Sequence, residues 1–354
     1  MATPTPLQQI TSEVGSLKSK INTLQDGVRL TRTRDTLEDI QTTINNMGQR
    51  VATLRSKGYV FEKTLETQAM DFASQWAIIL PNVQQQINLQ SASLSSSLRS
   101  IEVQLPRLTN SLNNPTTARP ILNNLKTSIS SLESNISSVE RMVNGMYDTL
   151  NNQVQKMVKH MNDIEWMLTQ ISEASFKLMP NEAGVMAVKS EWWKSGKEQK
   201  DDPEGVLYLT DQRLIFEQKE EVATKKILFI ATEKQKIQNL LLDNPVALVE
   251  NIKTSKQGML KNEDHLDIVF RTGAQVRSAH FHIWQDGSFW QALINRVLTK
   301  DFDKDRTVAI DQADLEKVKS APTVCPSCGG RIDQVILKGM DSISCGFCGQ
   351  VIRL

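Results

Sequence analysis

Residues 122–171 form the longest apolar repeat in the chain and read LNNLKTSISSLESNISSVERMVNGMYDTLNNQVQKMVKHMNDIEWMLTQI. Their apolar positions recur at alternating spacings of three and four, except for two consecutive fours around Leu150. This spacing predicts a helix of about 75 Å with one narrow apolar seam and a stutter that relaxes left-handed supercoiling. The seam must be covered by another helix, from this chain or from a second copy. It consists of Leu122, Leu125, Ile129, Leu132, Ile136, Val139, Val143, Met146, Leu150, Val154, Met157, Met161, Ile164, Leu168 and Ile171.

Apolar repeats of the same kind precede this seam. Breaks at Arg29–Asp35, Lys57-Gly58 and Asn113-Asn114-Pro115 separate them. Pro81 is expected to kink or end its helix, because proline lacks a backbone donor and clashes with the preceding turn. Short connections between helices of similar length favour antiparallel neighbours. The sequence therefore predicts a long antiparallel coiled-coil rod over residues 7–178, with helices at about 7–56, 60–112 and 118–175. A parallel homo-oligomer built through 122–171 is the alternative.

The charge balance argues against nucleic acid as a partner. Lys and Arg total 41 against 40 Asp and Glu, so the net charge is +1. Nonspecific phosphate binding needs a basic excess. The N-terminus has no charged segment followed by an apolar core, so we expect no signal peptide. No apolar run approaches the length of about 18 residues that a membrane span needs. We therefore expect a cytoplasmic protein.

At Met179-Pro180 the apolar period changes from that of a helix to that of a strand. Asp211-Gln212 joins two such strands, and a tight antiparallel hairpin would place Leu207 and Leu209 on one face with Leu214 and Phe216. Asp286 is expected to cap a following amphipathic helix that carries Trp290. The predicted strands lie at 184–192, 205–210, 213–217, 247–253, 265–271 and 278–284.

Residues 205–216, GVLYLTDQRLIF, resemble the hairpin of GRAM and bacterial pleckstrin-homology-like domains. Trp290 matches the tryptophan that such domains place against the open end of their barrel. The resemblance covers about residues 180–300 and implies a small barrel with a C-terminal helix over 179–301. It also implies binding of lipid headgroups or of protein, without catalysis. Residues 225–244 depart from the pattern, since a strand followed by a helix with Ile237, Leu240 and Leu241 is expected there.

The loop after Trp192-Trp193 is the candidate contact surface of this domain. Lys194, Lys197 and Lys200 lie where a pleckstrin-type domain would present basic groups to an anionic headgroup. Four acidic residues share the loop and cancel this charge, namely Glu198, Asp201, Asp202 and Glu204. One of the two tryptophans is expected in the core, which leaves Trp193 as the candidate lipid or partner contact.

The histidines give no catalytic motif. His280 and His282 share the face opposite the core, but no neighbouring cysteine or carboxylate cluster completes a metal set, so we expect packing roles. His160 and His265 are isolated in the sequence. The chain also lacks a glycine-rich phosphate loop, a nucleophile elbow and a metalloprotease motif. We expect no enzyme.

The last 30 residues carry all four cysteines as two C-x-x-C pairs, Cys325/Cys328 and Cys345/Cys348. Their spacing resembles that of a zinc ribbon over 325–354. Four thiolates suit one structural Zn²⁺ ion, and a site with four protein ligands is closed to substrate. So short a segment would need the metal to fold. Disulfides, a redox pair or an iron–sulfur site are the alternatives.

Together these features predict a multidomain α + β protein. We expect a non-catalytic interaction scaffold that presents a pleckstrin-homology-like domain and the ribbon to protein partners, with self-association through the coiled coil. A peripheral membrane adaptor that binds anionic lipid is the alternative, and a nucleic-acid accessory protein is the third reading. The predicted division is the rod at 7–178, the barrel at 179–301, a linker at 302–324 with a short helix over Ala313–Val318, and the ribbon at 325–354.

Overall fold

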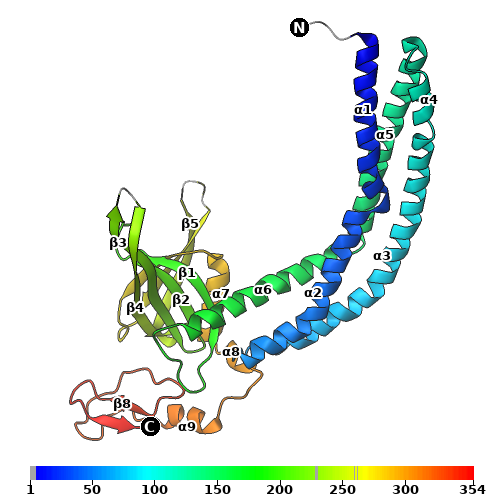
Figure 1. The fold of residues 1–354 in the computed structure, drawn as a ribbon. Helices are drawn as coiled ribbons and strands as arrows, with labels where there is room; N and C mark the ends of the chain where they lie inside the picture. The colour runs from blue at the N-terminus through cyan, green and yellow to red at the C-terminus, as the bar shows by residue number, and fades with distance from the viewer. Residues whose placement is uncertain (1–4, 228–229, 259, 261) are drawn as a thin grey trace. The chain divides into compact units, whose positions relative to one another are not determined.

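The computed structural model describes residues 5–354 except 228–229, 259 and 261. The chain combines long helices with an antiparallel sheet (Figure 1) and divides into two compact units. The helical unit comprises Met1–Gln49 and Glu66–Val158, and the sheet unit comprises Arg50–Leu65 and Lys159–Leu354. In the described part of the chain, no helix combines the length and the hydropathy of a membrane span.

Six helices precede the sheet, and the C-terminal parts of α2 and α6 belong to the sheet unit. α1 packs against α5 in the same direction, since Glu13 pairs with Arg119 and Lys20 pairs with Glu133. α2 and α3 run in opposite directions, because Arg34 bonds Asn88 while Gln41 accepts from the Trp76 indole. The helix bounds are α1 Pro6–Arg29, α2 Thr31–Ser56, α3 Leu65–Glu102, α4 Leu105–Asn110, α5 Pro115–Gly145 and α6 Asp148–Ser172.

The seam of residues 122–171 is buried at most of its positions, as its spacing predicted. At the stutter the helix is interrupted between Gly145 and Asp148, and Tyr147 takes the buried place expected for Met146. The Tyr147 ring packs edge-on against Trp76, with 6.2 Å between the ring centroids. α3 continues through Pro81, which therefore does not end the helix. The rod and the predicted domain division stay predictions.

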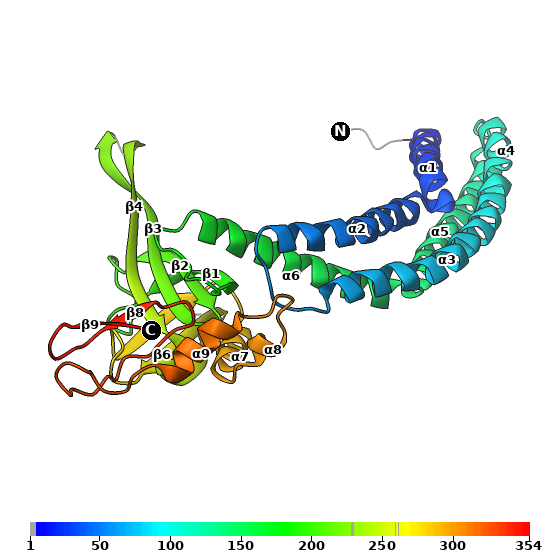
Figure 2. The same ribbon diagram turned by 90° about the horizontal axis from the view of Figure 1, so that it is seen from below.

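The sheet unit contains one seven-stranded antiparallel sheet in the order β4-β3-β2-β1-β7-β6-β5. The edge strands β4 and β5 do not pair with each other over the described residues, so the sheet is open. β3 and β4 continue beyond β2 as a two-stranded arm (Figure 2). The bounds are β1 Gly184–Trp192, β2 Glu204–Thr210, β3 Arg213–Ile227, β4 Ile230–Pro245, β5 Val249–Gln257, β6 Glu263–Phe270 and β7 Ser278–Ile283.

The hairpin between β2 and β3 has the predicted register. Leu207 pairs with Phe216 and Leu209 with Leu214, and all four side chains are fully buried. Aromatic rings complete the core, where Trp192 lies 5.9 Å from Phe216 between ring centroids. Burial of such large rings is the main stabilising contribution to a small sheet.

Three helices follow the sheet. Asp286 caps α7 (Gly287–Leu298) by accepting from the Phe289 amide at 2.9 Å, as predicted, and Trp290 is fully buried. Short α8 (Asp301–Lys304) and α9 (Gln312–Ser320) occupy the expected linker. Phe302 of α8 packs edge-on against Phe61 at 5.2 Å, so this segment is part of the packed unit.

Residues 237–241 correct one expectation. They lie in strand β4, paired with β3, and do not form the helix predicted around Ile237, Leu240 and Leu241. The strand pairing overrides their local helical spacing. Positions 228–229 of the same predicted segment lie outside the described residues. A short two-stranded sheet pairs β8 (Ser342–Ser344) with β9 (Val351–Arg353), and Arg331 forms a single bridge with Val324.

A half-buried ion pair joins the two chain segments of the sheet unit. His160 Nε2 lies 2.7 Å from Glu62 Oε2. Burial lowers the pKa of His160, but the hydrogen bond and charge of Glu62 outweigh burial and raise it above 6.5. Burial likewise raises the pKa of Glu62, but His160 outweighs this and holds it below 4.5. The ion pair therefore stabilises the fold most between pH 4.5 and pH 6.5.

His160→Gln should lower the free energy of unfolding by about 1–2 kcal/mol near pH 5.5 and by less near pH 8.5. The raised pKa of His160 makes its contribution complete below pH 6.5 and lost as pH rises through the folded value. Glu62 has the opposite sign, since its contribution is complete above pH 4.5 and lost as pH falls. Urea denaturation at both pH values measures the difference. Lys156→Gln, at an exposed position of the same helix, should change stability little at either pH. Equal losses for His160→Gln at both pH values would contradict the ion pair.

Candidate metal centre

The two cysteine pairs lie on matching backbone turns. In the first turn, the Gly329 amide donates to the Cys325 carbonyl and the Cys325 amide to the Gly330 carbonyl. In the second turn, Gly349 donates to Cys345, and Cys345 donates to the Gln350 carbonyl. Gly329 and Gly349 both have positive φ, 73° and 74°, a conformation that favours glycine. The glycine after each C-x-x-C therefore shapes a turn that points two sulfurs to one side.

The four sulfurs have the spacing of a metal site. Cys325 Sγ lies 3.7 Å from Cys348 Sγ, and Cys328 Sγ lies 3.7 Å from Cys345 Sγ. All four lie within 4.8 Å of one another. Sulfurs at 2.3 Å from a tetrahedral zinc ion would lie about 3.8 Å apart, whereas a disulfide needs about 2.05 Å. The donor set and its geometry therefore fit zinc, and the disulfide alternative does not fit.

The thiols are unequal in acidity. Amide hydrogen bonds, from Cys348 and then Phe347, lower the pKa of the Cys345 thiol to about 6. The pKa of Cys325 is also lowered, chiefly by the Cys328 amide. For Cys328 the Gly330 amide favours the thiolate, but the contact with Cys348 and burial outweigh it and raise the pKa to about 12. Four thiolates this close repel one another, so a divalent cation is the group that would allow all four to ionise.

Little apolar surface supports this region. Its core consists of two cysteines with Ile343 and Ile352, flanked by four partly buried residues, Ile332, Ile336, Met340 and Leu354. A core of this size does not fold a chain segment by itself. We refer to residues 325–354 as the cysteine module.

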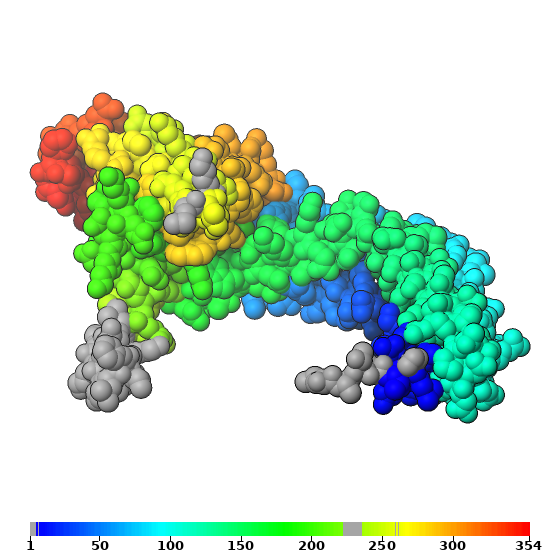
Figure 3. Space-filling model, turned by 90° about the horizontal axis from the view of Figure 1, so that it is seen from above, coloured from blue at the N-terminus to red at the C-terminus, as the bar shows by residue number. Residues whose placement is uncertain are grey.

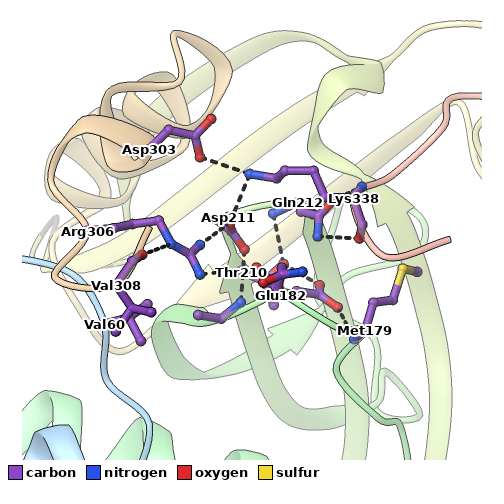
Figure 4. Close-up of polar contacts among 12 residues, drawn as sticks. Val60, Met179, Glu182, Thr210, Asp211, Gln212, Asp303, Arg306, Val308 and Lys338 are labelled. Atoms are coloured by element: carbon purple, nitrogen blue, oxygen red, sulfur yellow. Dashed lines mark hydrogen bonds and ion pairs between the residues drawn. The ribbon is translucent and has the colours of Figure 1, made fainter. Parts of the chain in front are cut away.

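The cysteine module is held against the sheet by a buried polar junction (Figure 4). Lys338 Nζ lies 3.1 Å from Asp211 Oδ2 and 2.8 Å from Asp303 Oδ1. The Gln212 side chain bonds both the amide and the carbonyl of Lys338. The space-filling view shows the C-terminal residues (red) against the sheet (yellow and green) in Figure 3. Lys338 lies between the two cysteine pairs, so the junction and the metal centre belong to one chain segment.

The turn between β2 and β3 supplies most of this junction. The Asp211 side chain is 1% exposed, accepts from the Ala183 amide and also pairs with Arg306 at 2.8 Å. Burial raises its pKa despite these cations. On the other side of the turn, Arg213 pairs with Glu182 at 2.7 Å and with Asp243 at 2.7 Å. The sequence marks Asp211-Gln212 only as a turn, because the charged partners of this turn lie far away in the chain.

Gly339 allows the close approach of the module to the sheet unit. Its φ is +89°, and a Cβ there would lie 2.2 Å from the Pro180 carbonyl oxygen. A side chain at this position would therefore have to displace the backbone. Substitution of Gly339 would therefore disturb the junction without changing a cysteine.

The predicted contact loop is exposed but organised by an acidic residue. The Asp202 carboxylate accepts from the Lys194 and Gln199 amides at 3.1 and 2.7 Å. Lys194, Lys197 and Lys200 are exposed at the surface. Trp193 differs from its expected place, because it is 7% exposed and packs on histidine rings. It is part of the packed sheet unit and not a surface contact.

The histidine rings under Trp193 form a cluster that sequence reasoning missed. His265, expected to be isolated, is paired across β6 and β7 with His282. Glu263 also lies near them, so carboxylates do accompany the histidines. Only the pairing of strands brings these positions together.

Comparisons with known proteins give no family. No family model matches the chain, and no curated protein matches it. Two solved structures of the DH/PH domains of p115-RhoGEF, one of them a mutant, are similar to it at 11% and 13% identity. They cover 77% and 83% of this chain and 98% and 91% of their own chains, with TM-scores of 0.21 and 0.20. Scores this low support no conclusion about fold or function.

Cys345→Ser should remove the order of the cysteine module, because a hydroxyl replaces one thiolate of the metal centre. Metal binding supplies on the order of 10–16 kcal/mol in comparable peptides. Hydrogen exchange should then show loss of amide protection over 325–354, with the sheet strands still protected. Removing metal from the native chain with a chelator should do the same.

Ser344→Ala changes the exposed residue just before Cys345, at the end of β8, and serves as the control. It should keep both the metal and the amide protection. Full protection over 325–354 in the Cys345→Ser variant, or in metal-free protein, would show that the module folds without a metal.

Proposed function

We propose that this chain is a non-catalytic interaction scaffold whose sheet and cysteine module form one composite binding head. The observation that carries the proposal is the buried junction of Lys338 with Asp211 and Asp303. Buried ion pairs contribute little net stability, because desolvation offsets the attraction, but they can fix one orientation. A module that acted independently of the sheet would have no use for such a junction. Its fixed orientation favours a surface that both parts share.

A small apolar cavity at the junction supports a protein partner. It has a volume of about 280 Å³ and lies between the sheet, α7–α9 and the cysteine module. Pockets for drug-sized ligands are usually about 300–1,000 Å³. A cavity below that range suits one apolar side chain of a protein. Its apolar lining includes Val246, Val297, Leu298, Leu315, Val318 and Ile336.

Within this proposal the metal is one structural Zn²⁺ ion on Cys325, Cys328, Cys345 and Cys348. The sulfur spacing of 3.7 Å in both cross-pairs supports this assignment. Four protein ligands leave no position for substrate, so the ion would hold the module together and take no part in a reaction. Self-association through the predicted coiled coil of residues 7–178 is a further part of this proposal.

A peripheral membrane adaptor is the second candidate. The GRAM and pleckstrin-homology-like resemblance and the exposed Lys194, Lys197 and Lys200 favour it. Four acidic residues of the loop offset these lysines, since Asp202 keeps its charge while it accepts from two loop amides. A nucleic-acid accessory protein is the third reading, and the net charge of +1 argues against it.

Gly339→Ala should loosen the module and abolish capture of protein partners, because a Cβ there collides with the Pro180 backbone. Quantitative affinity purification would compare the native full-length chain, Gly339→Ala and Gly346→Ala. Gly346 has open space around its Cβ position and is the matched control in the same module. We expect the same partners with the native chain and Gly346→Ala, and at least a tenfold loss with Gly339→Ala. Zinc content should be equal in all three.

Two results would overturn the composite head. Retention of every partner by Gly339→Ala, with the module shown by hydrogen exchange to be loosened, would mean that docking is irrelevant. Absence of any reproducible protein partner would reject the scaffold itself. Flotation with phosphatidylcholine vesicles, with and without anionic lipid, tests the second candidate. Salt-sensitive binding that is lost on changing Lys194, Lys197 and Lys200 to Glu would favour the membrane adaptor.

A further inference from the structure

A cluster of imidazoles and carboxylates lies on the sheet, apart from the cysteine module. Strand pairing sets Glu191 of β1 beside His282 of β7, and His282 beside His265 of β6. The rings of His265 and His282 are stacked 4.9 Å apart. Trp193 covers them, with its ring centroid 4.6 Å from that of His265 and 5.9 Å from that of His282. The cluster is therefore built from three adjacent strands under one aromatic cover.

When the rings are uncharged, as metal binding requires, a chain of hydrogen bonds determines which nitrogen of each ring carries the proton. Asp267 Oδ1 lies 2.6 Å from His280 Nδ1, and a carboxylate only accepts, so this nitrogen donates. His280 Nε2 is then an acceptor, and it lies 3.0 Å from His265 Nδ1. His265 Nδ1 therefore donates to it. The remaining nitrogen of His265, Nε2, carries a bare lone pair.

This lone pair has no partner within the described residues. The His265 side chain is 0% exposed, and Nε2 makes no hydrogen bond. Glu263 Oε2, which is itself an acceptor, lies 3.9 Å from it. Two acceptors that face each other repel unless a cation or a proton donor lies between them.

We propose that Glu263, His265 and His282 bind a second divalent transition-metal ion, of the zinc class, on the sheet. The donor atoms of the three residues lie within 4.8 Å of one another. Ligand atoms of a tetrahedral zinc ion with bonds of about 2.1 Å lie roughly 3.4 Å apart. Side-chain rotations that move the donor atoms by about an ångström would therefore bring the three residues to this spacing. Glu263 is 40% exposed at its side chain and can make such a movement.

The surrounding residues match the support that metal-binding imidazoles need. A ligating histidine usually donates its other ring N–H to an acceptor such as a carboxylate, a backbone carbonyl or water. His265 does so through His280 to Asp267. Glu191 Oε2 lies 3.8 Å from His282 Nδ1 and is placed to support the second ring. Two imidazoles and one carboxylate favour Zn²⁺ over Mg²⁺ or Ca²⁺, which prefer oxygen ligands, and leave a coordination position open.

Metal stoichiometry of the full chain tests this site. Protein without a polyhistidine tag is equilibrated with Zn²⁺, freed of unbound ion, and measured by elemental mass spectrometry. We expect two ions per chain for the native protein and one for His282→Gln and Glu263→Gln. His160→Gln, at a histidine outside the cluster, should keep two. Cys345→Ser should lose the cysteine-bound ion and keep the second.

Asp267→Asn provides a variant that removes no ligand. It weakens the hydrogen-bond chain behind His265, and such changes typically reduce metal affinity about 10–100-fold. A zinc titration of this variant should therefore show a weaker second site beside an unchanged cysteine site. A single ion in the native chain would overturn the proposal, as would two tightly bound ions in Glu263→Gln and His282→Gln.

Discussion

The turn between β2 and β3 is the constraint on which the sheet unit depends. Its four residues, Thr210–Arg213, are all buried and polar, and each bonds a segment distant in sequence. Thr210 donates to Glu182, Asp211 pairs with Arg306 and Lys338, and Arg213 pairs with Glu182 and Asp243. Since a buried charge without its partner is strongly destabilising, these segments have to assemble together. The turn thus fixes the positions of α8, the cysteine module and the start of β1 at once.

Much of the fold was accessible from the sequence because its signals are local. The heptad spacing of 122–171 predicted most of the side chains that are buried, and alternation in GVLYLTDQRLIF predicted the hairpin register. Asp286 caps its helix as expected, since an N-cap needs only its next three residues. The same reasoning applies to the cysteines, whose spacing within each pair is a local property of one turn. These features require no knowledge of how distant segments meet.

The parts that sequence reasoning missed depend on pairings between distant positions. His265 becomes part of a cluster only because strand pairing places it opposite His282. Lys338 becomes part of the junction only because it lies beside Asp211, which is 127 residues away. Residues 237–241 have helical spacing, but pairing with β3 makes them a strand. Trp193 looks like a surface residue by alternation and is covered because histidine rings stack beneath it. In each case the deciding partner lies on another strand or in another region of the chain.

The position of Lys338 links metal occupancy of the cysteine module to the sheet through one thermodynamic cycle. Its ammonium group helps neutralise Asp211, and it is carried by the segment between Cys328 and Cys345. When that segment is ordered by a metal, Asp211 keeps two cationic partners, and when it is not, Arg306 alone remains close. If docking of the ordered segment stabilises the sheet, the docked sheet must strengthen metal binding by the same free energy, because both changes belong to one thermodynamic cycle. Metal binding by the cysteines and the stability of the hairpin turn are therefore coupled, although no cysteine belongs to the turn.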